Sequence, residues 1–164
     1  MSAERTHLGW GEGEAAARLA ALGIERPPVA APLASYVPAL RDGDLVLTSG
    51  QLPFVGGALP ATGKVGAEVD PEDAVALART AAVNALAAVH ELLGGLEAVE
   101  RVVKVVGFVA SAPEFTGQPA VVDGVSALLG EVFGEAGRHA RSAVGVAVLP
   151  KDSPVEVELT VRVR

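Results

Sequence analysis

The sequence contains no cysteine. Disulfide bonds, thiolate-bound zinc or iron–sulfur clusters and catalysis by a thiol nucleophile are therefore excluded. The three histidines, His7, His90 and His139, stand at unrelated positions, and this spacing predicts neither a zinc site nor a Ser/His/Asp site. We interpret His90 and His139 as structural or solvent-facing residues.

Basic and aromatic residues are both scarce. The chain has 13 Lys and Arg against 20 Asp and Glu, and the basic residues are scattered along it. Because affinity for nucleic acid depends on clustered cations, we expect no nucleic-acid partner. Aromatic residues make up only 4% of the chain, too few for a platform on which single-stranded bases stack.

No run of apolar residues approaches the roughly 18 that a membrane-spanning helix requires. The first residues, Met1–Trp10, include Glu4 and Arg5 where a secretory signal peptide would have its hydrophobic segment. We therefore expect a cytoplasmic protein with no membrane partner.

Small apolar residues are abundant instead. Hydrophobic residues make up 50% of the 164 residues and charged residues 20%, which is typical of one globular domain. An N-terminal extension precedes it: Glu12–Leu22 is rich in helix formers, and Pro27 and Pro28 begin a proline-rich linker. We expect residues 1–32 to form this extension and residues 33–164 to form the domain.

The domain begins with a predicted β-hairpin. Its strands are Tyr36–Leu40 and Leu45–Gly50, and Asp42 with Gly43 provides the turn signal between them. The following residues, 51–66, are rich in Gly and Pro, which indicates a long loop or an irregular short strand.

The clearest element is a helix that begins after Asp70 and ends at Gly94. Asp70 is the N-cap candidate, Pro71 suits the first helical position, and Asp73 would complete an acidic capping box. Apolar residues recur at helical spacing between these ends, so one face of the helix should pack on a sheet.

Four further elements follow in sequence. Valine content predicts a strand over Arg101–Ala110, helical spacing predicts a helix over Val122–Phe133, and two strands are predicted at His139–Leu149 and Val155–Val163. The order ββ(β)αβαββ predicts an α+β fold in which two helices cover one face of a mixed sheet.

Three segments resemble one family. HARSAVGVAVLPKDSPVEVE (His139–Glu158), ASYVPA (Ala34–Ala39) and LTSGQ (Leu47–Gln51) are similar to the RidA/YjgF family, also named for endoribonuclease L-PSP. The resemblance extends from about Leu33 to the C-terminus. It implies a chorismate-mutase-like fold, a homotrimer with a ligand cleft at each interface, and hydrolysis of reactive enamines and imines to 2-keto acids and ammonia without metal or organic cofactor.

The resemblance also implies roles for individual residues. Arg141 matches the arginine that binds the substrate carboxylate, and Glu156 matches the glutamate that positions the attacking water. Tyr36 matches a tyrosine that lines the cleft, while Ser49 and Gly50 match a segment whose backbone faces the ligand.

The sequence departs from the usual family pattern at several positions. Ala143 replaces a cysteine, Gly145 replaces a glutamate, and Asp123 stands where a ligand-contacting asparagine is usual. The loop Pro113–Pro119 is longer than usual. These departures predict a divergent subgroup, with Asp123 and Ala143 as ligand-binding positions.

Physical chemistry supports two of these roles independently. The planar guanidinium of an arginine such as Arg141 matches a carboxylate with two hydrogen bonds. A carboxylate such as Glu156 can accept a proton from water within about 3 Å, and burial would raise its pKa toward the working range. The alternatives are an arginine at the strand rim paired with a surface acid and a solvated glutamate.

A hairpin of the last two strands, with its turn near Asp152, would place Arg141 opposite Val163 and Glu156 opposite Val148. The two side chains would then lie about 23 Å apart in one chain. A site that uses both must therefore take one residue from each of two subunits.

Three functions remain open at this point. The leading one is enamine/imine deamination, and the alternative is a noncatalytic trimeric binder of small carboxylates. A ribonuclease is disfavoured because the chain is acidic and has no histidine pair or metal motif.

Overall fold

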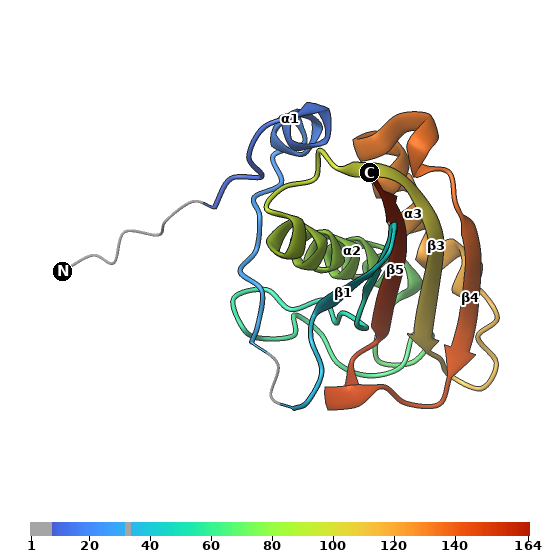
Figure 1. Cartoon of the computed structure of the whole chain (residues 1–164). Helices are drawn as coiled ribbons and strands as arrows, with labels where there is room; N and C mark the ends of the chain where they lie inside the picture. The colour runs from blue at the N-terminus through green and yellow to red at the C-terminus, as the bar shows by residue number, and fades with distance from the viewer. Residues whose placement is uncertain (1–7, 32–33) are drawn as a thin grey trace.

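The computed structural model describes residues 8–31 and 34–164, so Met1–His7 and the expected boundary at Pro32 and Leu33 lie outside the described residues. Figure 1 shows a mixed sheet with the strand order β1-β2-β5-β3-β4. The strands are β1 (Ala39–Asp42), β2 (Leu45–Thr48), β3 (Val99–Ala110), β4 (Ala140–Val146) and β5 (Val155–Val163). The helices are α1 (Glu14–Ala21), α2 (Pro71–Leu93) and α3 (Gln118–Phe133), with short 3-10 turns η1 (Gly134–Gly137) and η2 (Pro150–Asp152).

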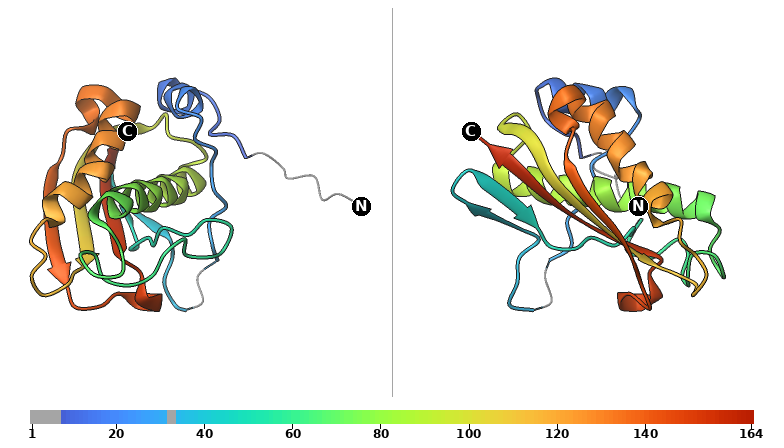
Figure 2. Two further views of the ribbon diagram at one scale, coloured as in Figure 1. Left: turned by 180° about the vertical axis from the view of Figure 1, so that it is seen from behind. Right: turned by 90° about the vertical axis from the view of Figure 1, so that its right-hand side faces the viewer.

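The two long helices, α2 and α3, cover one face of the sheet, as Figure 2 shows from two further directions. Valines at alternate positions of β5 are buried on the face of the sheet that α2 contacts. This confirms the predicted α+β fold with two helices on one face. None of the helices in the described part of the chain has the length and apolar content needed to cross a membrane.

The predicted hairpin of the last two strands is wrong. β4 pairs in parallel with β3 at the sheet edge, whereas β5 lies between β2 and β3 and is antiparallel to both. The chain crosses from the edge to the interior of the sheet through η2, where Lys151 and Asp152 both have positive φ. A tight turn signal and an alternating strand are compatible with either arrangement, so sequence alone does not separate them.

The predicted first hairpin is confirmed with shifted ends. Ala39 pairs with Thr48 and Asp42 with Leu45, and Tyr36 lies before the strand rather than in it. Residues 51–66 form a loop with isolated β-bridges, one of which joins Gln51 to Val157.

Helix α2 has the predicted ends. Pro71 occupies the first turn, and Gly94 ends the helix in the left-handed region at φ 77°. The predicted capping box is absent, because the Asp70 side chain makes no capping hydrogen bond.

Small side chains let the helices approach each other and the sheet closely. Most of the buried residues of α2 are alanines. A Cβ at Gly124 of α3 would overlap the backbone oxygen of Val75 in α2, and a Cβ at Gly107 of β3 would overlap the side chain of Val122 in α3. The alanine and glycine content therefore reflects close packing between layers.

The N-terminal segment packs on the same core. Trp10 and Leu19 are buried with the core residues, and the Trp10 Nε1 donates a hydrogen bond to the Ile24 oxygen at 2.8 Å. Arg18 of α1 donates to the backbone oxygen of Val132 in α3 at 3.2 Å. α1 is thereby fixed beside the end of α3.

We predict that Gly124→Ala lowers the free energy of unfolding by about 1–3 kcal/mol, because the added methyl group would push α2 and α3 apart. Gly130→Ala is the matched control on the same helix. A Cβ at Gly130 meets nothing within 4 Å, so this change should stabilise the protein by about 0.5–1 kcal/mol. Thermal or urea unfolding measures both, and equal effects of the two substitutions would contradict the close crossing at Gly124.

Candidate functional site

The structure separates the predicted site residues into two groups on opposite faces of the sheet. Arg141 and Ala143 of β4 point toward α3, which carries Asp123. Glu156 of β5 is on the opposite, open face and lies against Gly50, directly after β2. Pairing with β3 fixes these directions, because neighbouring residues in a strand point to opposite faces.

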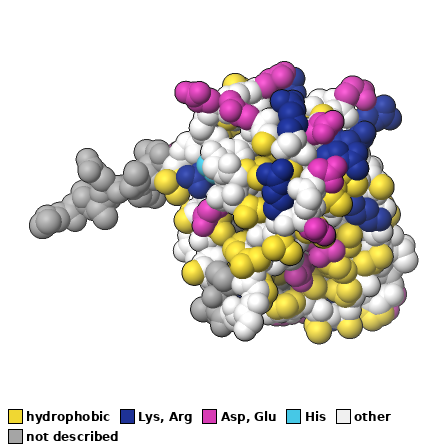
Figure 3. Space-filling view, in the orientation of Figure 1, with side chains coloured by type: hydrophobic (Ala, Val, Ile, Leu, Met, Phe, Trp, Pro, Cys, Tyr) yellow, Lys and Arg dark blue, Asp and Glu magenta, His cyan; other side chains and the backbone are white. Residues whose placement is uncertain are grey.

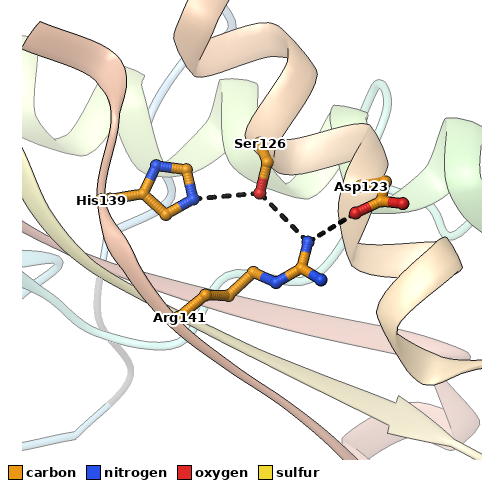
Figure 4. Close-up of polar contacts among 4 residues, drawn as sticks. All are labelled: Asp123, Ser126, His139 and Arg141. Carbon is orange, nitrogen blue, oxygen red and sulfur yellow. Dashed lines mark hydrogen bonds and ion pairs between the residues drawn. The ribbon is translucent and has the colours of Figure 1, made fainter. Parts of the chain in front are cut away.

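Arg141 occupies a site built by β4 and α3 (Figure 4). Its Nη1 donates to the Asp123 Oδ1 at 2.7 Å and to the Ser126 Oγ at 3.2 Å. Asp123 and Ser126 are three residues apart on the helix, so both face the strand. Among the described residues, the Nε and Nη2 of Arg141 have no hydrogen-bond partner, and the side chain is 24% exposed. One edge of the guanidinium is held in place, and the other is available to a ligand.

A serine–histidine pair lies next to the ion pair of Arg141 and Asp123. The Ser126 Oγ lies 3.0 Å from the His139 Nε2, and the His139 Nδ1 lies 2.6 Å from the backbone oxygen of Gly137. Ser126 is not among the site residues predicted from the sequence, and His139 was predicted to be structural or solvent-facing. The position of Ser126, three residues after Asp123, was the available signal for the serine, whereas nothing in the sequence places His139 beside it.

Ala143 and Gly145, which differ from the residues usual in the family, lie on the same side of β4 as Arg141. A Cβ at Gly145 would come within 2.7 Å of the Gln118 Nε2. That amide nitrogen donates to the Ser111 Oγ at 3.1 Å and to the Phe115 oxygen at 2.8 Å. The Gln118 side chain therefore occupies space that a larger residue at 145 would need.

On the open face, Glu156 depends on the absence of a side chain at Gly50. A Cβ at position 50 would overlap the Glu156 carboxylate, so glycine is required there while the carboxylate keeps this position. Burial, and to a smaller extent the negative charge of Glu158, raises the pKa of Glu156.

Ser49 directly precedes Gly50 in the sequence, and its hydrogen bonds reach the residues after Tyr36. The Ser49 hydroxyl donates to the backbone oxygen of Val37 at 2.6 Å and the Ser49 amide to that of Pro38 at 2.8 Å. Ser49 thus fastens the residues that follow Tyr36, whose own side chain is 58% exposed.

One chain does not bring Arg141 and Glu156 together. Arg141 is opposite Val105 of β3, and Glu156 is opposite Phe108 on the other side of the same strand. The predicted separation of about 23 Å along a hairpin is wrong, because it assumed direct pairing. Three residues along β3 and two strand spacings give roughly 14 Å between Cα atoms. The side chains also leave opposite faces of the sheet.

The open face is rich in exposed apolar side chains. Leu40 of β1, Leu47 of β2 and Val144 of β4 are all more than 40% exposed. Figure 3 shows hydrophobic side chains gathered over this side of the molecule, with acidic groups among them and basic groups toward one end. Within residues 8–31 and 34–164, no cluster of three or more His, Asp or Glu side chains is arranged to hold a metal ion.

The raised pKa of Glu156 predicts a pH-dependent stability. A carboxyl whose pKa is higher in the folded than in the unfolded protein binds its proton more tightly when folded. Its contribution to the free energy of unfolding is full below the usual value of 4.5 and is lost as pH rises through the raised pKa. Glutamine does not titrate, so the Glu156→Gln protein should not lose this part of its free energy of unfolding. Its stability relative to the parent protein should therefore increase as pH rises through that interval.

Unfolding curves at several pH values measure this difference. Glu158→Gln is the control, because it removes the neighbouring charge but not the burial and should reduce the pH effect only in part. Parallel stability profiles for Glu156→Gln and the parent protein would contradict the assignment.

The chain matches one protein-family model and is similar to several known proteins. The family model described as "YjgF/chorismate_mutase-like, putative endoribonuclease" matches residues 16–162. Protein TCP17 of Trypanosoma cruzi is 45% identical over 152 residues, which cover 91% of this chain and 94% of that protein. A RutC family protein of Haemophilus influenzae is 38% identical over 138 residues, which cover 82% of this chain and 89% of that protein.

Solved structures show the same fold. A crystal structure of a protein of unknown function from Agrobacterium tumefaciens has a TM-score of 0.85 and 45% identity, covering 90% of this chain and 91% of that chain. The structure of Escherichia coli TdcF with bound serine has a TM-score of 0.58 and 28% identity, covering 85% and 94%. Together with the family match, these likenesses confirm the resemblance found in the last strands: the chain belongs to the YjgF/chorismate mutase-like family.

Proposed function

We propose that the protein hydrolyses reactive enamines and imines of small 2-amino acids to 2-keto acids and ammonia. The observation that carries the proposal is the orientation of Arg141. Asp123 and Ser126 both bind its Nη1, which leaves the Nε and Nη2 to form two parallel hydrogen bonds with a substrate carboxylate. Family membership and the serine bound to TdcF, itself a small amino acid with a carboxylate, support this choice of ligand.

The hydrolytic step needs a water molecule and a group that accepts its proton. We assign this role to Glu156, whose half-buried carboxylate has a raised pKa. The water oxygen bonds to the imine carbon while its proton passes to the carboxylate. The proton then passes to the nitrogen, which gives a carbinolamine. The carboxylate next takes the proton of the new hydroxyl group and passes it to the same nitrogen, so that the carbonyl forms as the carbon–nitrogen bond breaks and ammonia leaves. These reaction steps require no metal or organic cofactor.

Because Arg141 and Glu156 lie on opposite faces of one sheet, we propose that they meet between subunits of a homotrimer. The exposed apolar side chains of the open face, including Leu47 and Val144, provide area for such an interface. Each of the three clefts would then take the arginine from one subunit and the glutamate from its neighbour. We also infer a cytoplasmic location for the protein.

A second candidate is a noncatalytic trimeric binder of small carboxylates. The specific observation in its favour is at β4, where Ala143 and Gly145 replace the family's larger polar residues and Gln118 fills the space beside Gly145. This change alters the cleft while leaving the arginine in place. Both candidate functions include binding of a small carboxylate, and only the enzyme would also accelerate imine hydrolysis.

We predict that the protein accelerates release of keto acid and ammonia when an amino acid oxidase supplies imino acids, and that Arg141→Ala abolishes this effect. Loss of a bidentate charged contact should also weaken binding of 2-ketobutyrate by roughly tenfold or more in calorimetry. Arg138→Ala is the control, because Arg138 is exposed and pairs with Glu135. Keto acid binding without acceleration would identify a binder, and equal binding by the Arg141→Ala protein would place the ligand elsewhere.

We also predict complementation between two inactive variants. Arg141→Ala and Glu156→Ala subunits, refolded together, should regain activity because some interfaces then combine both intact residues. Mass spectrometry under native conditions would verify the mixed assemblies and show whether they contain three subunits. Verified mixed assemblies without activity would contradict a site shared between subunits.

A further inference from the structure

Ser126 has an unusual hydrogen-bond arrangement for a serine in the middle of a helix. Such hydroxyls commonly donate to the carbonyl four residues earlier in their own helix, as Thr80 of α2 does to the Ala76 oxygen at 3.2 Å. The Ser126 hydroxyl instead meets two side chains from outside α3, His139 and Arg141 (Figure 4).

The direction of each hydrogen bond follows from the backbone. The Gly137 oxygen can only accept, so the Nδ1 of His139, 2.6 Å away, carries a hydrogen. In a neutral imidazole the Nε2 is then the acceptor, and the Ser126 hydroxyl 3.0 Å away donates to it. The fold therefore selects the tautomer in which His139 can take a proton from Ser126.

The cation on the other side completes the arrangement. The Arg141 Nη1 donates to the Ser126 Oγ at 3.2 Å, so its positive charge stabilises negative charge that develops on this oxygen. A hydroxyl within hydrogen-bond distance of a base, with the base held by a third group, is the arrangement of an activated serine nucleophile. Here the third group is the Gly137 oxygen.

We propose that Ser126 is a nucleophile that cleaves esters or thioesters of short dicarboxylic acids with one free carboxylate. The free edge of Arg141 would bind that carboxylate roughly 7 Å from the Ser126 Oγ, a gap that three methylene groups and the attack distance span. This activity uses Arg141 but does not require imine hydrolysis, so it extends beyond the proposed function.

The reaction balances with water as the second substrate. The Ser126 Oγ bonds to the acyl carbon while its proton moves to the His139 Nε2. The bond to the leaving oxygen or sulfur breaks, and that atom takes the proton from His139. Water then attacks the acyl-serine, giving its proton to His139, and the acid leaves as the Ser126 hydroxyl is restored.

The first test uses mono(4-nitrophenyl) glutarate as the acyl donor and the neutral 4-nitrophenyl valerate as its control, with each rate measured above the hydrolysis of the same ester in buffer alone. We expect a burst of nitrophenolate and a glutaryl group on Ser126 in peptide mass spectra, with the glutarate ester favoured at least tenfold after this subtraction. His139→Asn should slow acylation by roughly 100-fold or more, and Ser126→Ala should abolish it. Ser142→Ala is the control, because Ser142 is on the opposite face of β4 and accepts from Lys104. Labelling of lysines alone, or an unchanged rate in Ser126→Ala, would overturn the proposal.

A second test remains valid even if the alanine variant does not fold. The chain has no cysteine, so Ser126→Cys introduces a single thiol whose alkylation by iodoacetamide can be followed against pH. Activation by His139 and Arg141 should shift the half-maximal rate at least about one pH unit below the ordinary thiol value near 8.5. Ser35→Cys, at an exposed position, is the control and should react near that ordinary value. Equal midpoints, or a Ser126→Cys thiol that does not react, would show that Ser126 only supports Arg141 and would overturn the proposal.

Discussion

The parallel pairing of β4 with β3 determines where the guanidinium of Arg141 can lie. Val105, its partner in the register, points into the core, so Arg141 must point to the helical side. The antiparallel pairing of β5 on the other side of β3 places Glu156 on the open face. A site that needs both groups is consequently incomplete in one chain, which is why the proposed site lies between subunits.

The ion pair between Arg141 and Asp123 positions the guanidinium rather than contributing much stability. Asp123 is largely exposed, and pairs of this kind contribute at most about 1 kcal/mol. Their value here is geometric, because Asp123 and Ser126 bind one nitrogen and leave the opposite edge open. The same geometry serves both proposals: carboxylate binding uses the free edge, and the serine uses the bound one.

Local signals predicted what depends on local structure. Pro71 and Gly94 mark the ends of α2, and alternation over Val155–Val163 defines β5, because backbone conformation and burial act within a few residues. The order of strands was not predictable in this way, since a strand alternates identically beside a hairpin partner or between two others. The contact of Ser126 with His139 was missed for the same reason: it exists only after α3 and β4 pack together.

A crystal structure of the assembled protein with 2-ketobutyrate would test the shared site most directly. The ligand carboxylate should lie on the Nε and Nη2 of Arg141, and the Glu156 of a neighbouring subunit should be closer to the ligand than the Glu156 of the same chain. Asp123 and Ser126 should remain on the Nη1. A ligand bound away from Arg141, or an Arg141 to Glu156 approach that is shortest within one chain, would contradict the account.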